Sequence, residues 1–244
     1  MMRQLFLVAG AALLLSACGS QAPQGEQGTS TPAPQPSDAA AAVSTPTTPR
    51  LTGKFAPQDE CSQLPGWAEF QTALRSAIKS RDAKAVAALA NPQIKLEFGG
   101  GGGRSALIAR LGGKDQPPLW PELDRLDGLG CAYDPASKTA ALPWFSQQDL
   151  SPQDPFEVLL AAGPKVVLRE TAEGQGRPIA ELSWILVVPL GQPVANSTFR
   201  KVSVVGHPQS GFIDTAQLRS AVGYRLIASR APQGWQIDAF VAGD

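Results

Sequence analysis

The sequence predicts an α+β fold, in which a small helical region is followed by a β-rich region and a C-terminal β-hairpin, after a disordered N-terminal segment. Three observations lead to this prediction. Apolar residues follow helical spacing in the first half, they alternate with polar residues in the second half, and two alternating runs joined by a short turn end the chain. We expect these segments: signal peptide (1–17), tether (18–58), helical region (59–155), β-rich region (156–220) and hairpin (221–244).

The composition limits the classes of protein to be considered. The 244 residues include 21 Lys and Arg, 21 Asp and Glu and a single His, so the formal net charge is zero. Removal of residues 1–17 takes away only Arg3 among the charged residues, which leaves the chain nearly neutral. A neutral chain has no electrostatic field that attracts nucleic acid or anionic lipid. We therefore expect no nucleic-acid partner.

The first seventeen residues have the pattern of a secretory signal. Arg3 precedes an apolar run from Leu5 to Leu15, and small residues follow that run. The run is shorter than the roughly 20 apolar residues of a membrane-spanning helix. The alternatives are an ordinary signal peptide with an incidental cysteine, or a buried apolar helix.

The end of this signal resembles a bacterial lipobox, with the residues Leu15-Ser-Ala-Cys18. The resemblance implies cleavage before Cys18, a diacylglyceryl group on its sulfur and an acyl group on its new amino end. Several acyl chains hold a protein firmly at a membrane. Gly19 follows the cysteine, where an Asp would favour retention in the inner membrane. We therefore expect an outer-membrane lipoprotein of the cell envelope, with its folded region in the periplasm.

The next segment is predicted to be a tether. Pro, Ser, Thr, Ala, Gln and Gly dominate from Gly19 to Gln58, and prolines recur throughout. Such a composition buries too little apolar surface to offset the entropy of an ordered chain. We expect residues 18–58 to be disordered and to act as a spacer.

The cysteines predict one disulfide. The lipobox takes Cys18, which leaves Cys61 and Cys131 as a pair. Outside the cytoplasm an even remainder predicts a disulfide, which would stabilise the fold by about 4 kcal/mol. The alternative is two free, buried thiols. No Cys-x-x-Cys motif and no neighbouring His is present, so we expect neither a redox role nor a metal site.

The region 59–155 is predicted to be mainly helical. The first helix carries apolar residues at helical spacing: Trp67, Phe70, Leu74, Ala77 and Ile78. Asp82 is the expected N-cap of a second helix. The run from Ser105 to Leu111 predicts a third helix, and the run from Trp120 to Leu129 a fourth. Apolar residues alternate from Ile94 to Phe98, so one strand is expected there.

The remaining chain is predicted to be β. The expected strands are Val158–Leu160, Val166–Leu168, Leu182–Leu190, Phe199–Val205, Gly211–Asp214, Leu218–Ser220, Tyr224–Arg230 and Trp235–Val241. The last two are joined by a Pro-Gln-Gly turn and form the hairpin.

Part of this β region resembles a bacterial SH3-like domain. In that family an early Val-Leu-Arg strand opens a small barrel, and a late Gly-aromatic-Ile segment carries the last strand and a short 3₁₀ turn. The matching residues are Leu168, Arg169, Gly211, Phe212, Ile213 and Leu218. The Gly-Trp pair that is usual in the middle strand is absent, and Ser183-Trp184 is nearest to it. The resemblance implies an SH3-like β-barrel over residues 156–220.

Two further resemblances concern the chain around that segment. The helices between 66 and 90, the strand near Phe98 and a closing strand with Trp235 look like the cone-shaped folds of the nuclear-transport-factor-like superfamily. On that view the SH3-like segment is an insertion. The lipobox, the tether and the ending Trp-x-Ile-x-Ala-Phe-x-Ala-Gly-Asp244 resemble uncharacterised SH3-domain-containing lipoproteins of α-proteobacteria, which imply no known activity.

Residues that could carry catalysis are scarce. His207 is the only imidazole, and its turn-rich loop predicts a solvated side chain. The run from Gly99 to Arg104 lacks the Lys-Ser/Thr of a phosphate loop, so we expect a flexible turn at a helix N-terminus, with weak anion binding by free N–H groups as the alternative. Asp124 and Asp127 share a helix face, where solvation explains them better than glycan cleavage. We expect no catalytic residue, no cofactor and no metal.

These observations predict a binding protein rather than an enzyme. We expect a lipid-anchored cell-envelope protein whose SH3-like domain engages a peptide, peptidoglycan or another envelope protein. The candidate binding residues are the aromatics Trp144, Trp184 and Phe212. One alternative is a small-ligand or enzymatic pocket on a cone-shaped fold, near Phe98 and Trp235. Another is a structural or assembly lipoprotein without a discrete site.

Overall fold

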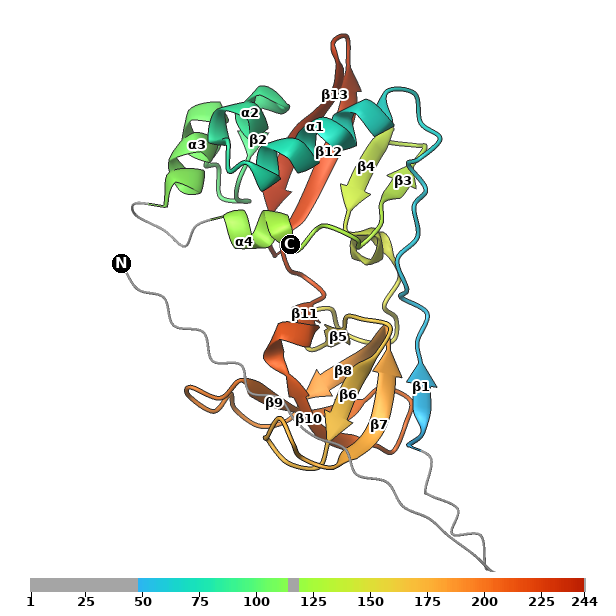
Figure 1. The fold of residues 1–244 in the computed structure, drawn as a ribbon. Helices are drawn as coiled ribbons and strands as arrows, with labels where there is room; N and C mark the ends of the chain where they lie inside the picture. Colours follow the sequence, from blue (N-terminus) through green and yellow to red (C-terminus); the bar gives the residue numbers. More distant parts are fainter. Residues whose placement is uncertain (1–47, 114–118, 244) are drawn as a thin grey trace, which may run out of the picture. The chain divides into compact units, whose positions relative to one another are not determined.

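The computed structural model describes residues 48–113 and 119–243 (Figure 1). Residues 46–244 form one compact unit. The predicted signal peptide, Cys18 and most of the predicted tether lie outside the described residues. Within the described ranges, no helix has the length and apolar character needed to cross a membrane.

Two sheets and four α-helices make up the described part, so the predicted α+β class is confirmed. The first sheet has five strands in the order β2 (Ala90–Lys95), β13 (Gly234–Val241), β12 (Arg225–Ala231), β4 (Thr139–Leu142) and β3 (Ala132–Asp134). The second has eight strands in the order β1 (Arg50–Thr52), β7 (Pro178–Ser183), β6 (Val166–Arg169), β10 (Ser210–Asp214), β9 (Phe199–Val204), β8 (Ile185–Pro189), β5 (Leu159–Ala161) and β11 (Leu218–Ser220). The helices are α1 (Trp67–Lys79), α2 (Ala83–Ala88), α3 (Arg104–Gly112) and α4 (Trp120–Asp124), with 3₁₀ turns η1 (Trp144–Gln147) and η2 (Thr215–Gln217).

The C-terminal hairpin is the centre of the five-stranded sheet. β12 and β13 pair antiparallel along their whole length, as the sequence predicts. β12 also pairs with β4, and β13 runs parallel to β2. The hairpin therefore belongs with the helices rather than with the eight-stranded sheet. The region 59–155, predicted to be mainly helical, supplies the other three strands of this sheet.

Helix α1 packs an apolar face against this sheet (Figure 1). Trp67 is fully buried and meets Trp235 of β13 edge-on, with ring centroids 5.0 Å apart. Beyond the helix, Arg81 adopts a left-handed backbone conformation, with φ 55°. Asp82 then begins α2, because its carboxylate accepts the N–H of Ala85 at 2.9 Å. The predicted N-cap is confirmed.

Two elements of this half differ from prediction. The strand predicted at 94–98 is β2, which starts earlier, at Ala90, and ends at Lys95. It ends there because the N–H of Leu96 bonds to the carbonyl of Gly101 and the chain turns back. Phe98 lies in that turn and is 57% exposed. Helix α4 ends at Asp124 and turns replace the rest of the predicted helix. Gly130 there has a positive φ of 73°, and a Cβ on it would overlap the backbone of Gln58.

The eight-stranded sheet has a linear order with β1 and β11 at its ends, so the described residues form no closed barrel. The strand predicted at 182–190 is two strands, β7 and β8, which separate at Trp184. Trp184 has a positive φ of 48°, which turns the chain between two strands that are not neighbours in the sheet. A core of buried aliphatic residues, including Val166, Leu182 and Ile213, packs against this sheet.

The folded region begins earlier than predicted. Residues 49–61, which we call the strap, were expected to belong almost wholly to the disordered tether. Instead β1 pairs parallel with β7, and the N–H of Gly53 bonds to the carbonyl of Ser183 at 2.8 Å. Leu51 packs on the core of the eight-stranded sheet, and Phe55 is buried between the two sheets with Trp144 and Leu186. Burial of these two apolar side chains stabilises the strap against the folded region.

Candidate functional site

The three aromatics predicted to bind a ligand do not form one surface. Trp144 lies in η1 and is 5% exposed, and its Nε1 donates to Glu60 Oε1 at 2.8 Å. A buried, hydrogen-bonded indole is part of the core, so the prediction of Trp144 as an exposed binding residue is wrong. Trp184 is half-buried and packs against the same core cluster as Trp144.

Phe212 lies apart from that cluster. It belongs to β10, is half-buried, and has the ammonium of Lys201 5.9 Å from its ring centroid. Phe212 is therefore a partly accessible aromatic residue on the eight-stranded sheet.

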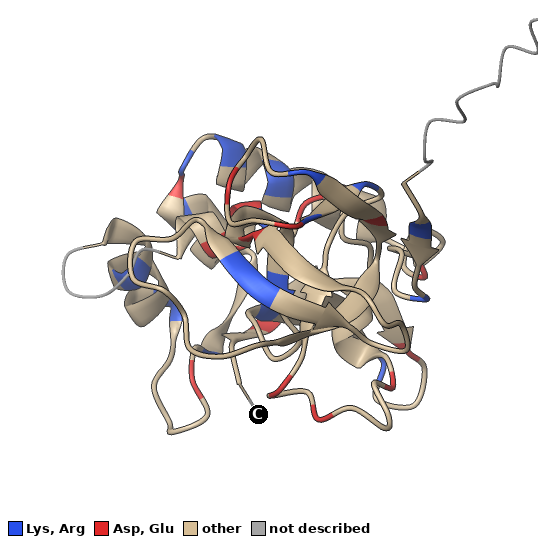
Figure 2. Cartoon of the chain, turned by 90° about the horizontal axis from the view of Figure 1, so that it is seen from below, with Lys and Arg blue, Asp and Glu red and all other residues tan. Residues whose placement is uncertain are grey.

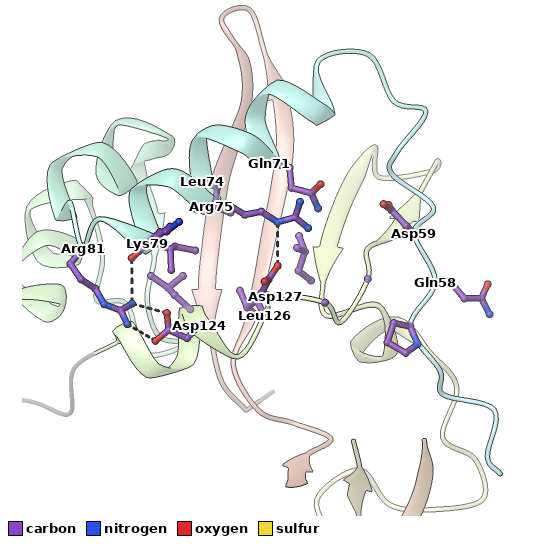
Figure 3. A pocket seen from close by; sticks show the side chains of 16 residues that line it. Gln58, Asp59, Gln71, Leu74, Arg75, Lys79, Arg81, Asp124, Leu126 and Asp127 are labelled. Carbon is purple, nitrogen blue, oxygen red and sulfur yellow. Dashed lines mark hydrogen bonds and ion pairs between the residues drawn. The ribbon is translucent and has the colours of Figure 1, made fainter. Parts of the chain in front are cut away.

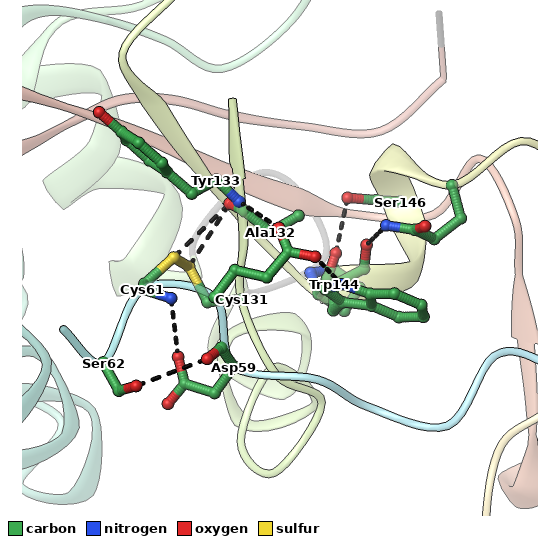
Figure 4. Close-up of a disulfide and its surroundings, with 11 residues drawn as sticks. Asp59, Cys61, Ser62, Cys131, Ala132, Tyr133, Trp144 and Ser146 are labelled. Carbon is green, nitrogen blue, oxygen red and sulfur yellow. Dashed lines mark hydrogen bonds between the residues drawn. A yellow bond between two sulfur atoms is a disulfide. The ribbon is translucent and has the colours of Figure 1, made fainter. Parts of the chain in front are cut away.

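The predicted disulfide between Cys61 and Cys131 is present (Figure 4). Both half-cystines are fully buried. The N–H of Cys131 bonds to the carbonyl of Gln58 at 2.8 Å, and that of Glu60 bonds to the carbonyl of Cys131 at 2.9 Å. The bridge and these bonds fasten the end of the strap beside the turn that follows α4.

This fastening creates a groove that the sequence did not predict. It has a volume of about 750 Å³ and lies between α1 on one side and the strap, α4 and the turn after α4 on the other (Figure 3). We call it the α1 groove. Its apolar lining consists of Leu74, Ile78, Leu123, Leu126 and Leu142, together with Pro57. Four of the five leucine and isoleucine side chains are buried, so the floor is apolar and largely covered.

Charged side chains of both signs surround that floor. Basic residues stand on the α1 side, and acidic residues stand on the strap and around α4 (Figure 3). Across the whole described chain, too, Lys and Arg are interspersed with Asp and Glu (Figure 2). The groove therefore has an apolar floor, with positive charges along one edge and negative charges along the other.

One ion pair at this rim is fixed by several contacts. Arg81 binds both carboxylate oxygens of Asp124, at 2.6 and 2.7 Å, and its guanidinium lies 5.2 Å from the ring centroid of Trp120. The hydrogen bond from Arg81 holds the pKa of Asp124 below its ordinary value of 3.8, and the same bond raises the pKa of Arg81. This pair joins the end of α1 to α4, and its geometry is that of a structural contact.

A second pair is much looser. Arg75 uses only its Nε, which lies 3.2 Å from Asp127 Oδ1, and the side chains are 56% and 71% exposed. Lys79, one turn further along α1, has no hydrogen-bond or ion-pair partner among the described residues. Residues four apart on a helix share a face. The groove therefore has uncommitted cationic donors beside its apolar floor.

Asp124 does not have the pKa of a general acid. A general acid needs a raised pKa, whereas the pKa of Asp124 is lowered by Arg81. His207 is exposed in the turn between β9 and β10, outside the groove lining. No cluster of three His, Cys, Asp or Glu that could hold a metal occurs within 48–113 and 119–243. The apolar floor and the charged rim are features common to ligand-binding sites.

The alternative site near Phe98 and Trp235 is only partly formed. Phe98 lines a second cavity of about 590 Å³ with the glycine-rich turn that follows it. Trp235 is 6% exposed and donates its indole N–H to the carbonyl of Pro65 at 3.0 Å, so it is a core residue. The structure does not bring these two aromatics to one cavity.

Some signals for the α1 groove were present in the sequence. The sequence predicts that Asp124 and Asp127 share a helix face, and the apolar spacing of α1 predicts its buried side. The partners of these aspartates, Arg75 and Arg81, are more than 40 residues away in the chain, with separations of 52 and 43. Only the tertiary structure shows this pairing.

Comparison with known proteins gives no further assignment. No protein-family model matches the chain, and no curated protein matches it significantly.

Proposed function

We propose that this protein is a lipid-anchored binding protein of the cell envelope that holds a short peptide segment in its α1 groove. The observation that carries the proposal is the groove itself, with its volume of about 750 Å³, its buried leucine floor and its charged rim. Ligand sites of this size combine an apolar lining with a few polar groups that orient the ligand. The lowered pKa of Asp124 argues against that residue as a general acid.

Two polar side chains support a peptide as the occupant. The amides of Gln58 and Gln71 line the groove and make no side-chain hydrogen bond among the described residues. Each amide offers a donor and an acceptor, which match the N–H and C=O groups of a peptide backbone. A purely hydrocarbon ligand has no groups for them.

The binding test uses the chain without residues 1–18, which leaves the compact unit 46–244 whole. Isothermal titration with a set of short apolar peptides should detect binding. Ile78→Glu puts a charge on the groove floor and should abolish it. Ala73→Glu is the matched control, because Ala73 is exposed on α1 outside the groove. Equal binding by both variants would contradict the proposal.

The anchor is tested separately. Residues 1–17 and Cys18 carry the lipobox resemblance, and the Cys18→Ala protein should leave the membrane fraction. A protein that stays in that fraction would overturn the anchor without affecting the groove.

A second candidate site lies on the eight-stranded sheet. The order β10, η2 and β11 places a 3₁₀ turn after the Gly-Phe-Ile segment, as the SH3-like resemblance implies. On this proposal an SH3-like domain engages a peptide or peptidoglycan through Phe212. Phe212→Ala should then remove retention by isolated peptidoglycan sacculi, while Ile78→Glu should leave it unchanged.

A further inference from the structure

We infer that the α1 groove recognises the carboxylate at the C-terminal end of a peptide whose last side chains are apolar, with Arg75 and Lys79 as its anion-binding groups. This inference rests on the proposed function and names the chemical class of the ligand. It follows from a difference between the two arginines that line the groove.

Arg81 is fully used by the protein. Both of its terminal nitrogens bind Asp124, one of them also reaches the carbonyl of Ile78, and the guanidinium stacks on Trp120. A ligand could engage Arg81 only by breaking several contacts at once. This arginine shapes the groove and does not receive the ligand.

Arg75, in contrast, makes only one side-chain hydrogen bond among the described residues. Its single bond, from Nε to Asp127, leaves its two terminal nitrogens without a partner among the described residues. The pair is largely exposed, with 56% of the Arg75 side chain and 71% of the Asp127 side chain accessible. Exposed ion pairs of this kind are weak. A ligand carboxylate that binds both terminal nitrogens makes a bidentate contact, which is stronger than the single bond to Asp127.

Lys79 adds a second cation on the same face. It lines the groove, is exposed, and has no partner in the described part of the chain. Figure 3 shows Lys79 and Arg81 at one end of the groove, Arg75 and Asp127 between the walls, and Asp59 and Gln58 at the far end. An anionic group is therefore favoured beside α1, and the polar strap is left for the rest of the ligand.

The apolar floor of the groove determines which kind of side chain lies next to the ligand's carboxylate. Leu74 and Leu126 are 4% exposed and Ile78 is half-buried, and all three line the groove beside these cations. An apolar side chain next to the carboxylate would cover them, which contributes favourable burial. The free amides of Gln58 and Gln71 then select a peptide over a fatty acid, which shares the carboxylate and the apolar body but has no amide groups.

Asp127 holds only Nε of Arg75, so a carboxylate bound to the two terminal nitrogens would lie beside it on the same guanidinium. The negative charge of Asp127 would repel that of the ligand, so Asp127 opposes the binding of an anion. Removal of the Asp127 charge therefore has opposite expected effects for an anionic ligand and for a cationic one. If the ligand is anionic at this end, removal of the Asp127 charge tightens binding; if the ligand's amine pairs with Asp127, the same change weakens it.

The experiment titrates the chain without residues 1–18 with N-acetylated tripeptides that end in Ala, Val, Leu or Phe. Each tripeptide is used with a free C-terminal carboxylate and as its carboxamide, and decanoate serves as the fatty-acid arm. We expect the carboxylate form to bind roughly tenfold more tightly than the carboxamide, the scale of one charge-assisted contact. Arg75→Gln should remove this difference, and Asp127→Asn should tighten the carboxylate form several-fold.

Arg177→Gln is the matched control. Arg177 forms a single exposed pair with Glu170 at 2.9 Å in the loop between β6 and β7, so its chemistry resembles that of Arg75 outside the groove. It should leave both peptide affinities unchanged. Equal affinities for carboxylate and carboxamide, or weaker binding by Asp127→Asn, would overturn the inference while the proposed groove stands. Tighter binding of decanoate than of every tripeptide would overturn the choice of a peptide, and no binding of any probe would overturn the proposed function as well.

Discussion

Removal of the disulfide should lower stability by an amount that can be worked out from its position in the chain. Cys61 and Cys131 are separated by 70 residues. Closing a loop of that length restricts the unfolded chain and stabilises the folded state by about 4 kcal/mol on the chain-entropy account. The double variant Cys61→Ala/Cys131→Ala should therefore lose about 4 kcal/mol of the free energy of unfolding.

The native contacts around the bridge indicate that the loss of stability comes from the unfolded chain and not from the folded state. The strap is also held at Gln58 and Glu60 by backbone bonds to Cys131, and Glu60 accepts the indole N–H of Trp144. These bonds remain in the double variant, so its folded state keeps the strap in place. The main effect of the variant is then the greater freedom of its unfolded chain.

Urea denaturation followed by tryptophan fluorescence measures the difference. Both proteins begin at residue 19, so that Cys18 takes no part, and the oxidised parent protein is the reference. The parent protein unfolded in the presence of a reductant should resemble the double variant. A loss below about 1 kcal/mol would refute the loop-entropy reasoning, because even short loops are expected to contribute more.

The remaining predictions concern the strap and the rim of the groove. Gly53→Ala should destabilise the protein by about 1–3 kcal/mol in thermal unfolding, because a Cβ there would overlap the carbonyl of Trp184; Gly174→Ala, which meets nothing within 4 Å, should have little effect, and equal effects would contradict the strap's close packing. Asp124→Asn should destabilise the protein at neutral pH, since the lowered pKa of Asp124 means that ionised Asp124 stabilises the fold above its ordinary pKa of 3.8. That difference should shrink as the pH falls through the lowered pKa, and a difference that stays constant down to strongly acidic pH in urea denaturation would show that the carboxylate is not responsible.

Much of the local structure could be predicted from the sequence. The apolar spacing from Trp67 to Ala77 gave the buried face of α1, and Asp82 begins α2 as a residue of its type should. The alternation around the Pro-Gln-Gly turn predicted the hairpin, and the cysteine count predicted the bridge. Each of these signals depends on a short stretch of chain or on counting alone.

The predictions failed where distant segments meet. Phe55 is an isolated apolar residue in a polar stretch, and its burial depends on Trp144 and Leu186, which are far away in the sequence. Trp144 was a candidate binding residue in the sequence analysis, but Glu60 of the strap accepts its indole N–H and the side chain is buried. The α1 groove depends on the same long-range packing, since its two walls come from residues near 58, 75 and 127. The local periodicity of apolar residues does not predict such long-range contacts.

The most direct test of the central claim is the place where a peptide binds. Methyl NMR spectra of the chain without residues 1–18 report separately on the isoleucine and leucine side chains of the two halves. On addition of an N-acetylated tripeptide that ends in Leu, the methyl signals of Leu74, Ile78 and Leu126 should shift, because these residues line the α1 groove. Shifts confined to Ile213, Leu168 and the other residues of the eight-stranded sheet would contradict the account.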